Sequence, residues 1–353
     1  MKISLRGPII FAMTLLSFFG LLTILSSQSE SASPYYLAFR QLISFAIAAG
    51  LMFLCGALPF RFFKKNGMLF SGISFLAVLI LPFFGTRING MCGWFRYGNF
   101  SLQPTEIAKG FFLLGLCVIL KHFPKEGARV GAGLLYTLVW IGAIVIQPDF
   151  GTSFIYFATF IALLFVTNIR WRWIFGCGVP ALCGAALFVY THPYAWKRLL
   201  AFVNPSSSWH LRHLELASAR GGWFGSKMGQ ALWSNAYVPL PYNDSAFATL
   251  TETIGFAGAL LVLLLFLLLL ASLSALALRR ELSGEARIFA AGCTIIIGVQ
   301  TLLHTGVNLS LLPPTGLTLP LISYGGSSLT GCGILLGMAL SAAKDKGISG
   351  DEA

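Results

Sequence analysis

The acidic residues that lie near long apolar segments are the first candidates for chemistry. The chain has 12 Asp and Glu residues, and most of them stand among basic or other polar neighbours. The exceptions stand at or inside apolar segments: Glu106, Asp149, Asp244 and Glu252. A carboxylate in such a place is costly unless it is paired, caps a helix or takes part in a reaction, for example as a general base.

Asp244 and Glu252 flank the start of the longest apolar run. Asp244 belongs to VPLPYNDSAF, and the run IGFAGALLVLLLFLLLLASLSALAL begins at Ile254. Asp244 is either a catalytic base or the N-cap of a helix that opens at Ser245. Glu252 needs a partner or a polar cavity, and both a structural pair and a substrate contact would satisfy it.

Two further acids precede predicted helices. Glu106 and Lys109 in QPTEIAKG are spaced i,i+3, so they lie on one helix face and can pair. Helix capping explains Glu106 near the positive end of the helix dipole, but it does not explain Lys109 one turn deeper. Asp149 in QPDFGT is either the N-cap of the next helix or part of a functional cavity.

Basic and glycine-rich segments could bind an anionic ligand. YAWKRLLAFVNP places Lys197 and Arg198 beside aromatic residues, which suits a helix that lies in the membrane interface and contacts anionic head groups. An ordinary interfacial helix has the same composition. The glycines of ARGGWFGSK would let backbone approach a ligand closely. A lipid that carries phosphate is the ligand that these residues predict.

The composition is that of a membrane protein. The 353 residues are 56% hydrophobic and 10% charged, far below the roughly 25% charged content of a soluble domain. About ten apolar segments are long enough to cross a bilayer as helices. They lie at Pro8–Leu25, Gln41–Leu58, Gly67–Phe84, Pro104–Leu120, Val130–Gln147, Gly151–Asn168, Ile174–Tyr190, Phe247–Leu278, Ile288–Leu309 and Ser328–Ala343. The sequence therefore predicts an all-α polytopic membrane protein.

The distribution of charge predicts the topology. The net charge of +12 comes from short basic clusters that fall on one side if the chain crosses ten times, which places both termini in the cytoplasm and excludes a nucleic-acid partner. A long extracytoplasmic loop, residues 191–246, then joins the seventh and eighth helices. We expect one integral membrane domain over residues 1–353, with its chemistry on the outer face.

Cysteine and histidine give no metal-binding pattern. On the predicted topology only one of the seven cysteines, Cys92, faces outward, so the cysteines are interpreted as apolar fillers. His210 and His213 lie three apart in the long loop without a carboxylate or cysteine cluster, and we interpret them as surface histidines. A divalent cation on a substrate phosphate is compatible with the chain, but the sequence contains no dedicated ligand set for one.

Seven motifs in order resemble the SEDS family (shape, elongation, division and sporulation), whose members include peptidoglycan polymerases. The motifs are FRQLISF, WFRYGNFSLQPTEIAKG, QPDFGTS, YAWKRLLAFVNP, ARGGWFGSK, VPLPYNDSAFATLTETIGFAG and LLPPTGLTLPLISYGGSSL. The last motif is more similar to the division branch than to the elongation branch. The chain departs from the family pattern at Tyr242 and Asn243, where His-Thr is usual, at Thr253, where a second Glu is usual, and at Gly93, where Arg is usual.

The resemblance implies glycosyl transfer on the outer face of a bacterial cytoplasmic membrane. Lipid II would be polymerised into glycan strands, with undecaprenyl pyrophosphate as the leaving group. Asp244 falls on the essential Asp of the family and is predicted to be the general base, helped by a partly desolvated site that would raise its pKa. The residues predicted to contact substrate are Glu106, Lys109, Asp149, Lys197, Arg198, Glu252, Ser323 and Tyr324.

The resemblance also implies partners. A class B penicillin-binding protein, which is a transpeptidase, would couple strand synthesis to crosslinking within the division or elongation machinery. Two other functions stay open at this point: a flippase for lipid II, and a noncatalytic scaffold for the transpeptidase. A flippase predicts functional charges on both faces of a central cavity, and a scaffold predicts that Asn could replace Asp244 as a helix cap.

Overall fold

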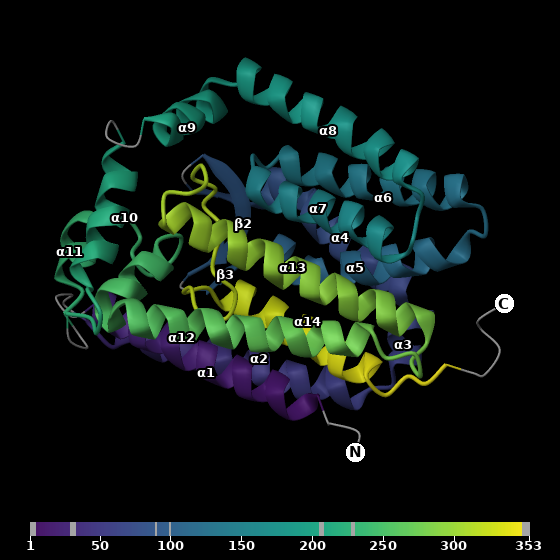
Figure 1. Cartoon of the computed structure of the whole chain (residues 1–353), viewed down its shortest axis with the longest axis horizontal. Helices are drawn as coiled ribbons and strands as arrows, with labels where there is room; N and C mark the ends of the chain where they lie inside the picture. Colours follow the sequence, from purple (N-terminus) through teal and green to yellow (C-terminus); the bar gives the residue numbers. More distant parts are fainter. Residues whose placement is uncertain are drawn as a thin grey trace.

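The computed structural model describes residues 5–28, 33–88, 90–98, 100–204, 208–226 and 230–347. Most of the long helices run side by side along the longest axis of the molecule (Figure 1). Three shorter helices gather at one end: α9 (Pro193–Val203), α10 (Trp209–Arg220) and α11 (Leu232–Tyr237). These three lie in the predicted long loop, so that loop is largely helical.

Helices form at all ten predicted apolar segments because a chain in lipid must satisfy its backbone hydrogen bonds internally. They are α1 (Arg6–Ser27), α2 (Tyr36–Ala57), α4 (Gly67–Phe84), α5 (Pro104–His122), α6 (Glu126–Val145), α7 (Phe150–Val166), α8 (Trp171–Thr191), α12 (Ala246–Ala277), α13 (Gly284–Asn308) and α14 (Gly326–Ala342). Among the described residues, seven of these are long and apolar enough to span a membrane, and α7 and α14 are shorter apolar helices. The polytopic α-helical fold is confirmed, while the number of crossings and the cytoplasmic termini stay predictions.

The segment between α4 and α5 forms a small sheet that the sequence did not predict. Strands β1 (Thr86–Ile88), β2 (Met91–Tyr97) and β3 (Phe100–Leu102) pair antiparallel in the order β1-β2-β3. The remaining short helix, α3 (Phe60–Lys65), joins α2 to α4.

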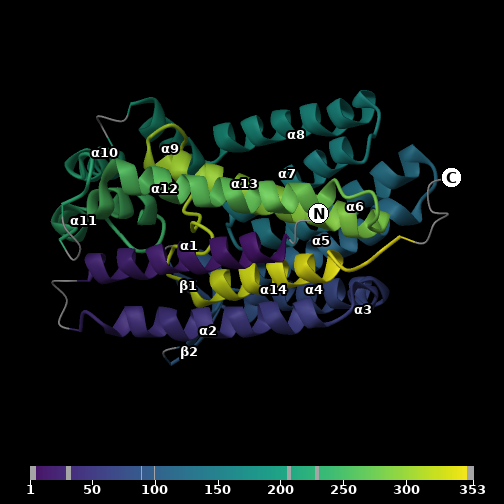
Figure 2. The same cartoon turned by 60° about the horizontal axis from the view of Figure 1, so that its bottom comes forward.

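The core of the bundle is built around α14, which lies alongside α2 (Figure 2). Glycines make this packing close: a Cβ at Gly333 would lie 2.3 Å from the carbonyl oxygen of Ala48. Helix α8 is different, because Cys177 is its one buried residue. It runs along the edge of the molecule and leads into α9 (Figure 1).

Helix α12 is broken at Gly255, whose φ of 73° and ψ of −176° are not helical. The segment 221–226 packs on this break, where Gly222 O accepts from Phe256 N at 2.8 Å and Trp223 O accepts from Ala257 N at 3.1 Å. A Cβ at Gly221 would lie 2.0 Å from a carbonyl oxygen of α12. The glycine of ARGGWFGSK that permits this close approach therefore serves packing on α12; the final Lys227 of that motif lies outside the described residues.

Candidate active site

A cavity of about 440 Å³ brings Asp244 together with Lys197 and Arg198. Its walls come from α9, α10, α13, the segment before α12 and the segment after α13. The described residues that line it are Lys197, Arg198, Ala201, Ser208, His210, Asp244, His304, Val307, Pro314, Thr315, Gly316 and Leu317. One carboxylate therefore shares a cavity with two basic side chains.

The backbone that carries Asp244 is held rigidly. Every carbonyl oxygen from Pro239 to Asp244 accepts a hydrogen bond, and Leu240 adopts a positive φ of 46°. In chain order, the donors are Ser245 Oγ, Asn243 N, Thr249 Oγ1, Tyr324 N, Ser323 Oγ and Asn308 Nδ2, at 3.2, 3.0, 2.8, 2.8, 2.6 and 2.9 Å. The position of the Asp244 backbone is thus set by three separate parts of the chain.

Two side chains of α13 cap the first turn of α12. Asn308 Oδ1 accepts from Ala248 N at 3.0 Å, and His304 Nε2 accepts from Phe247 N at 3.4 Å. Ser245 occupies the N-cap position and makes no side-chain cap hydrogen bond. The alternative interpretation of Asp244 as the N-cap is therefore wrong, because residues of another helix satisfy these N–H groups.

The Asp244 carboxylate has an oxygen without a protein partner. Its Oδ1 atom is buried and makes no hydrogen bond within the described part of the chain. Burial raises the pKa of Asp244, while its backbone hydrogen bond, His210 and Arg198 act in the opposite direction. A positioned carboxylate with a raised pKa and a free oxygen is suited to accept a proton.

The two predicted basic residues lie on α9, which begins with Pro193 in its first turn. Lys197 is exposed, whereas Arg198 is half-buried and its Nη1 donates to Pro314 O at 3.1 Å. Both line the Asp244 cavity. Together they offer positive charge to an anionic group that enters it.

Glu252 is held by a different set of contacts. Its side chain accepts from Trp233 N at 2.9 Å, from Ser234 N at 2.8 Å and from Ser234 Oγ at 2.6 Å. The residue is 1% exposed and does not line the described part of the Asp244 cavity. Of its two predicted roles, these contacts are those of a structural partner, which anchors the first turn of α11.

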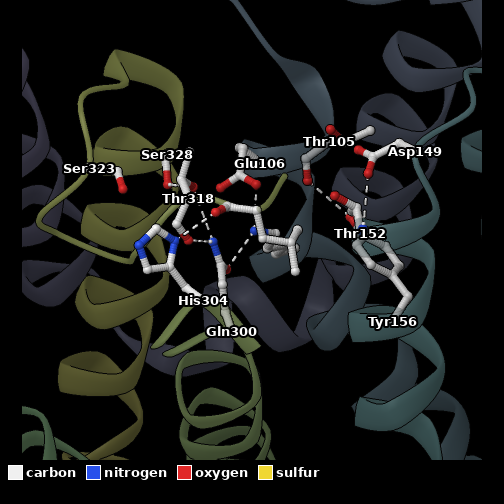
Figure 3. A network of polar contacts seen from close by, with 12 residues as sticks. Thr105, Glu106, Asp149, Thr152, Tyr156, Gln300, His304, Thr318, Ser323 and Ser328 are labelled. Carbon is white, nitrogen blue, oxygen red and sulfur yellow. Dashed lines mark hydrogen bonds and ion pairs between the residues drawn. The ribbon is translucent and has the colours of Figure 1, made fainter. Parts of the chain in front are cut away.

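Glu106 and Lys109 form the predicted ion pair, and both are buried. Figure 3 labels Glu106 together with Gln300, Thr318 and Ser328 of the surrounding network. Lys109 Nζ lies 2.6 Å from Glu106 Oε1 and 2.8 Å from Gln300 Oε1. Gln300 Nε2 in turn donates to Thr318 O at 2.9 Å, and Thr318 Oγ1 lies 3.1 Å from Ser328 Oγ. The space beside this network is about 10 Å³, room for at most one water. The structure does not bring Lys109 into the cavity of Asp244.

Asp149 is the N-cap of α7. Its Oδ1 accepts from Thr152 N at 3.0 Å, while its Oδ2 is buried without a partner in the described chain. Figure 3 places it on the far side of Glu106 from the residues of α13. Asp149 does not line the described part of the Asp244 cavity either.

Ser323 and Tyr324 contact the segment that carries Asp244. Ser323 Oγ donates to Asn243 O and accepts from Leu319 N at 2.8 Å. The rings of Tyr324 and Tyr242 pack edge to face, with centroids 5.7 Å apart. These contacts position the segment that carries Asp244. Ser323 and Tyr324 themselves do not line the described part of the cavity.

Sequence reasoning missed three residues of the site. His210 lines the cavity, whereas its neighbour His213 stacks on Tyr237 with ring centroids 5.3 Å apart, so the two histidines have different surroundings. His304 and Asn308 were not singled out at all. A usable signal was present, because Gln300, His304 and Asn308 recur every fourth residue and form a polar stripe along an apolar helix.

The chain matches known proteins over nearly its whole length. A family model for FtsW, RodA and SpoVE, described as "Cell cycle protein", matches residues 7–347. The chain belongs to this family. This match confirms the predicted resemblance to the SEDS family. It also agrees with the prediction of a multi-pass membrane protein.

Individual relatives agree with this assignment. The chain is 32% identical over 330 residues to a probable peptidoglycan glycosyltransferase FtsW of Coxiella burnetii, covering 88% of each chain. It is 33% identical to the protein of the same name in Alkalilimnicola ehrlichii, over 93% of this chain and 87% of the relative.

Solved structures of the family share the fold. A chain from a peptidoglycan synthase complex, described for its coordination of polymerization and crosslinking, superposes with a TM-score of 0.81 at 29% identity, over 96% of this chain and 97% of that one. The rod shape determining protein RodA of Thermus thermophilus superposes with a TM-score of 0.73 at 28% identity, over 96% of both chains.

Proposed function

We propose that this family member is a peptidoglycan glycosyltransferase that polymerises lipid II into glycan strands and releases undecaprenyl pyrophosphate. Its family and the names of its curated relatives support this activity. The observation that carries the assignment of the site is the Asp244 carboxylate, which has an unpartnered oxygen and shares a cavity with Lys197 and Arg198.

In the proposed reaction, Asp244 takes the proton of the acceptor sugar hydroxyl. The hydroxyl oxygen then forms a bond to the anomeric carbon of the donor, while the bond from that carbon to the pyrophosphate breaks. Lys197 and Arg198 offset the negative charge that develops on the leaving group. Asp244 is the one carboxylate among the described residues of the cavity, which favours a single displacement with inversion over a two-carboxylate retaining scheme.

The held backbone gives this base a defined position. An error of about 1 Å in the placement of a reacting group can cost about 10²-fold in rate. The hydrogen bonds to the carbonyls of 239–244 fix the segment before substrate arrives.

We further propose that the site faces outward from the bacterial cytoplasmic membrane and works with a class B penicillin-binding protein. The basic clusters support this orientation. The structural relative in a peptidoglycan synthase complex supports a transpeptidase partner.

The test is polymerisation of purified lipid II by the reconstituted protein with its cognate transpeptidase. Wild type is compared with Asp244→Asn and with Asp345→Asn, a matched change at a residue that bonds Ser283 outside the cavity. We expect no polymer from Asp244→Asn and normal polymer from Asp345→Asn, with normal folding and partner binding for both. Undiminished polymerisation by Asp244→Asn would show that Asp244 is not the general base. A wild type that makes no polymer would favour the flippase or the scaffold.

A further inference from the structure

A second titratable side chain of the cavity has no role in the proposed reaction so far. His210 is half-buried on α10 and lines the same cavity as Asp244. Within the described part of the chain its ring makes no hydrogen bond. His304, the other imidazole of the lining, is different: Nδ1 donates to Leu317 O at 2.7 Å and Nε2 accepts from Phe247 N. His304 therefore has no free nitrogen, whereas His210 can exchange a proton.

The charged and titratable side chains around His210 come from three directions. Asp244 faces it from the segment before α12, Lys197 and Arg198 from α9, and His304 from α13. Burial lowers the pKa of His210, and Arg198 lowers it further, while Asp244 raises it. Burial raises the pKa of Asp244. The two proton affinities therefore move toward each other, and a proton passes most easily between groups whose affinities are similar.

We propose that His210 is the proton relay of this site, which takes from Asp244 the proton of the acceptor hydroxyl and passes it to water at the cavity opening. The inference rests on the proposed glycosyl transfer. In each addition the acceptor O–H bond breaks, the new C–O bond forms, and the electron pair of the broken C–O bond leaves on the pyrophosphate. The proton moves from Asp244 to the imidazole and then to water. Asp244 is thereby returned to its charged form before the next addition.

Two other roles for His210 make different predictions. If His210 is purely structural, its replacement would lower the stability of the protein and leave the pH profile of the remaining activity unchanged. If His210 only contacts the substrate phosphate, its replacement would raise KM and leave kcat unchanged.

The test measures kcat and KM for lipid II from about pH 5 to about pH 8, a range that extends below the ordinary histidine pKa because burial lowers the pKa of His210. The variants are His210→Gln, His210→Ala and Asp244→Asn, and the matched control is His122→Gln, at the exposed end of α5. We expect kcat of both His210 variants to fall at least about ten-fold at neutral pH, with KM and melting temperature little changed. Added imidazole should restore part of the activity of His210→Ala.

The pH profile separates a relay from a binding group. Wild-type kcat should fall as pH drops through the pKa of His210, because the protonated ring cannot accept a proton, and this dependence should be missing in His210→Gln. A kcat within about a factor of two of wild type at every pH would overturn the relay. If Asp244→Asn is inactive in that case, the proposed function stands and only the role of His210 is lost. If Asp244→Asn is active, the base assignment itself fails.

Discussion

Replacing Glu252 by Gln is expected to weaken the fold and spare the chemistry. Trp233 N–H, Ser234 N–H and Ser234 Oγ all donate to the Glu252 carboxylate, which is buried. Gln offers one carbonyl oxygen and turns an NH₂ group toward donors. A Gln oxygen in the place of Oε2 can still accept from Ser234 N–H and Ser234 Oγ, so the bond from Trp233 N–H is lost and the other two go to a neutral acceptor.

The size of the effect follows from this count. A hydrogen bond to a charged group contributes about 1.5–3 kcal/mol and one between neutral groups about 0.5–1.5 kcal/mol. One lost bond and two weakened bonds therefore predict a decrease of about 3–6 kcal/mol in the free energy of unfolding. That is a large part of the roughly 5–15 kcal/mol of a typical domain. Ser234→Ala removes one of the three contacts and should cost about 1.5–3 kcal/mol.

Thermal unfolding in detergent and lipid II polymerisation per folded molecule measure the two quantities separately. We expect a lower melting temperature for Glu252→Gln than for Ser234→Ala, and a kcat near that of wild type for both at a temperature where they are folded. A Glu252→Gln protein with unchanged melting temperature and a kcat reduced about 100-fold would refute the structural role and place Glu252 in the chemistry.

Two further predictions concern buried polar groups near the site. Lys109→Met leaves Glu106 buried without its ion-pair partner and should lower the free energy of unfolding by about 3–5 kcal/mol. In thermal melts, the double variant with Glu106→Gln should recover much of this lost stability. A raised KM at unchanged stability would instead put Lys109 on the substrate. Asn308→Ala removes the donor to Asp244 O and should lower kcat about 10–100-fold with little change in KM. Thr305→Ala on the same helix is its control, and an unchanged kcat would show that Asp244 is held without Asn308.

The helices were predictable because lipid leaves a spanning segment few choices. Gly67–Phe84 was predicted with the bounds that α4 has, and the other nine helices differ from their predictions by a few residues. The break at Gly255 was not predictable in the same way. An isolated Gly inside an apolar run is compatible with a continuous helix, and the break depends on segment 221–226 packing there.

The sequence by itself determined which charges need an explanation, because a charge beside an apolar run is costly wherever the chain folds. Only the tertiary structure decided which of them have partners. Lys109 is held by Gln300, Glu252 by the first turn of α11, and Asp244 keeps an unpartnered oxygen in a basic cavity. The physical reason is that the energy of a charge depends on distances in space to groups far along the chain, and spacing in the sequence does not contain those distances.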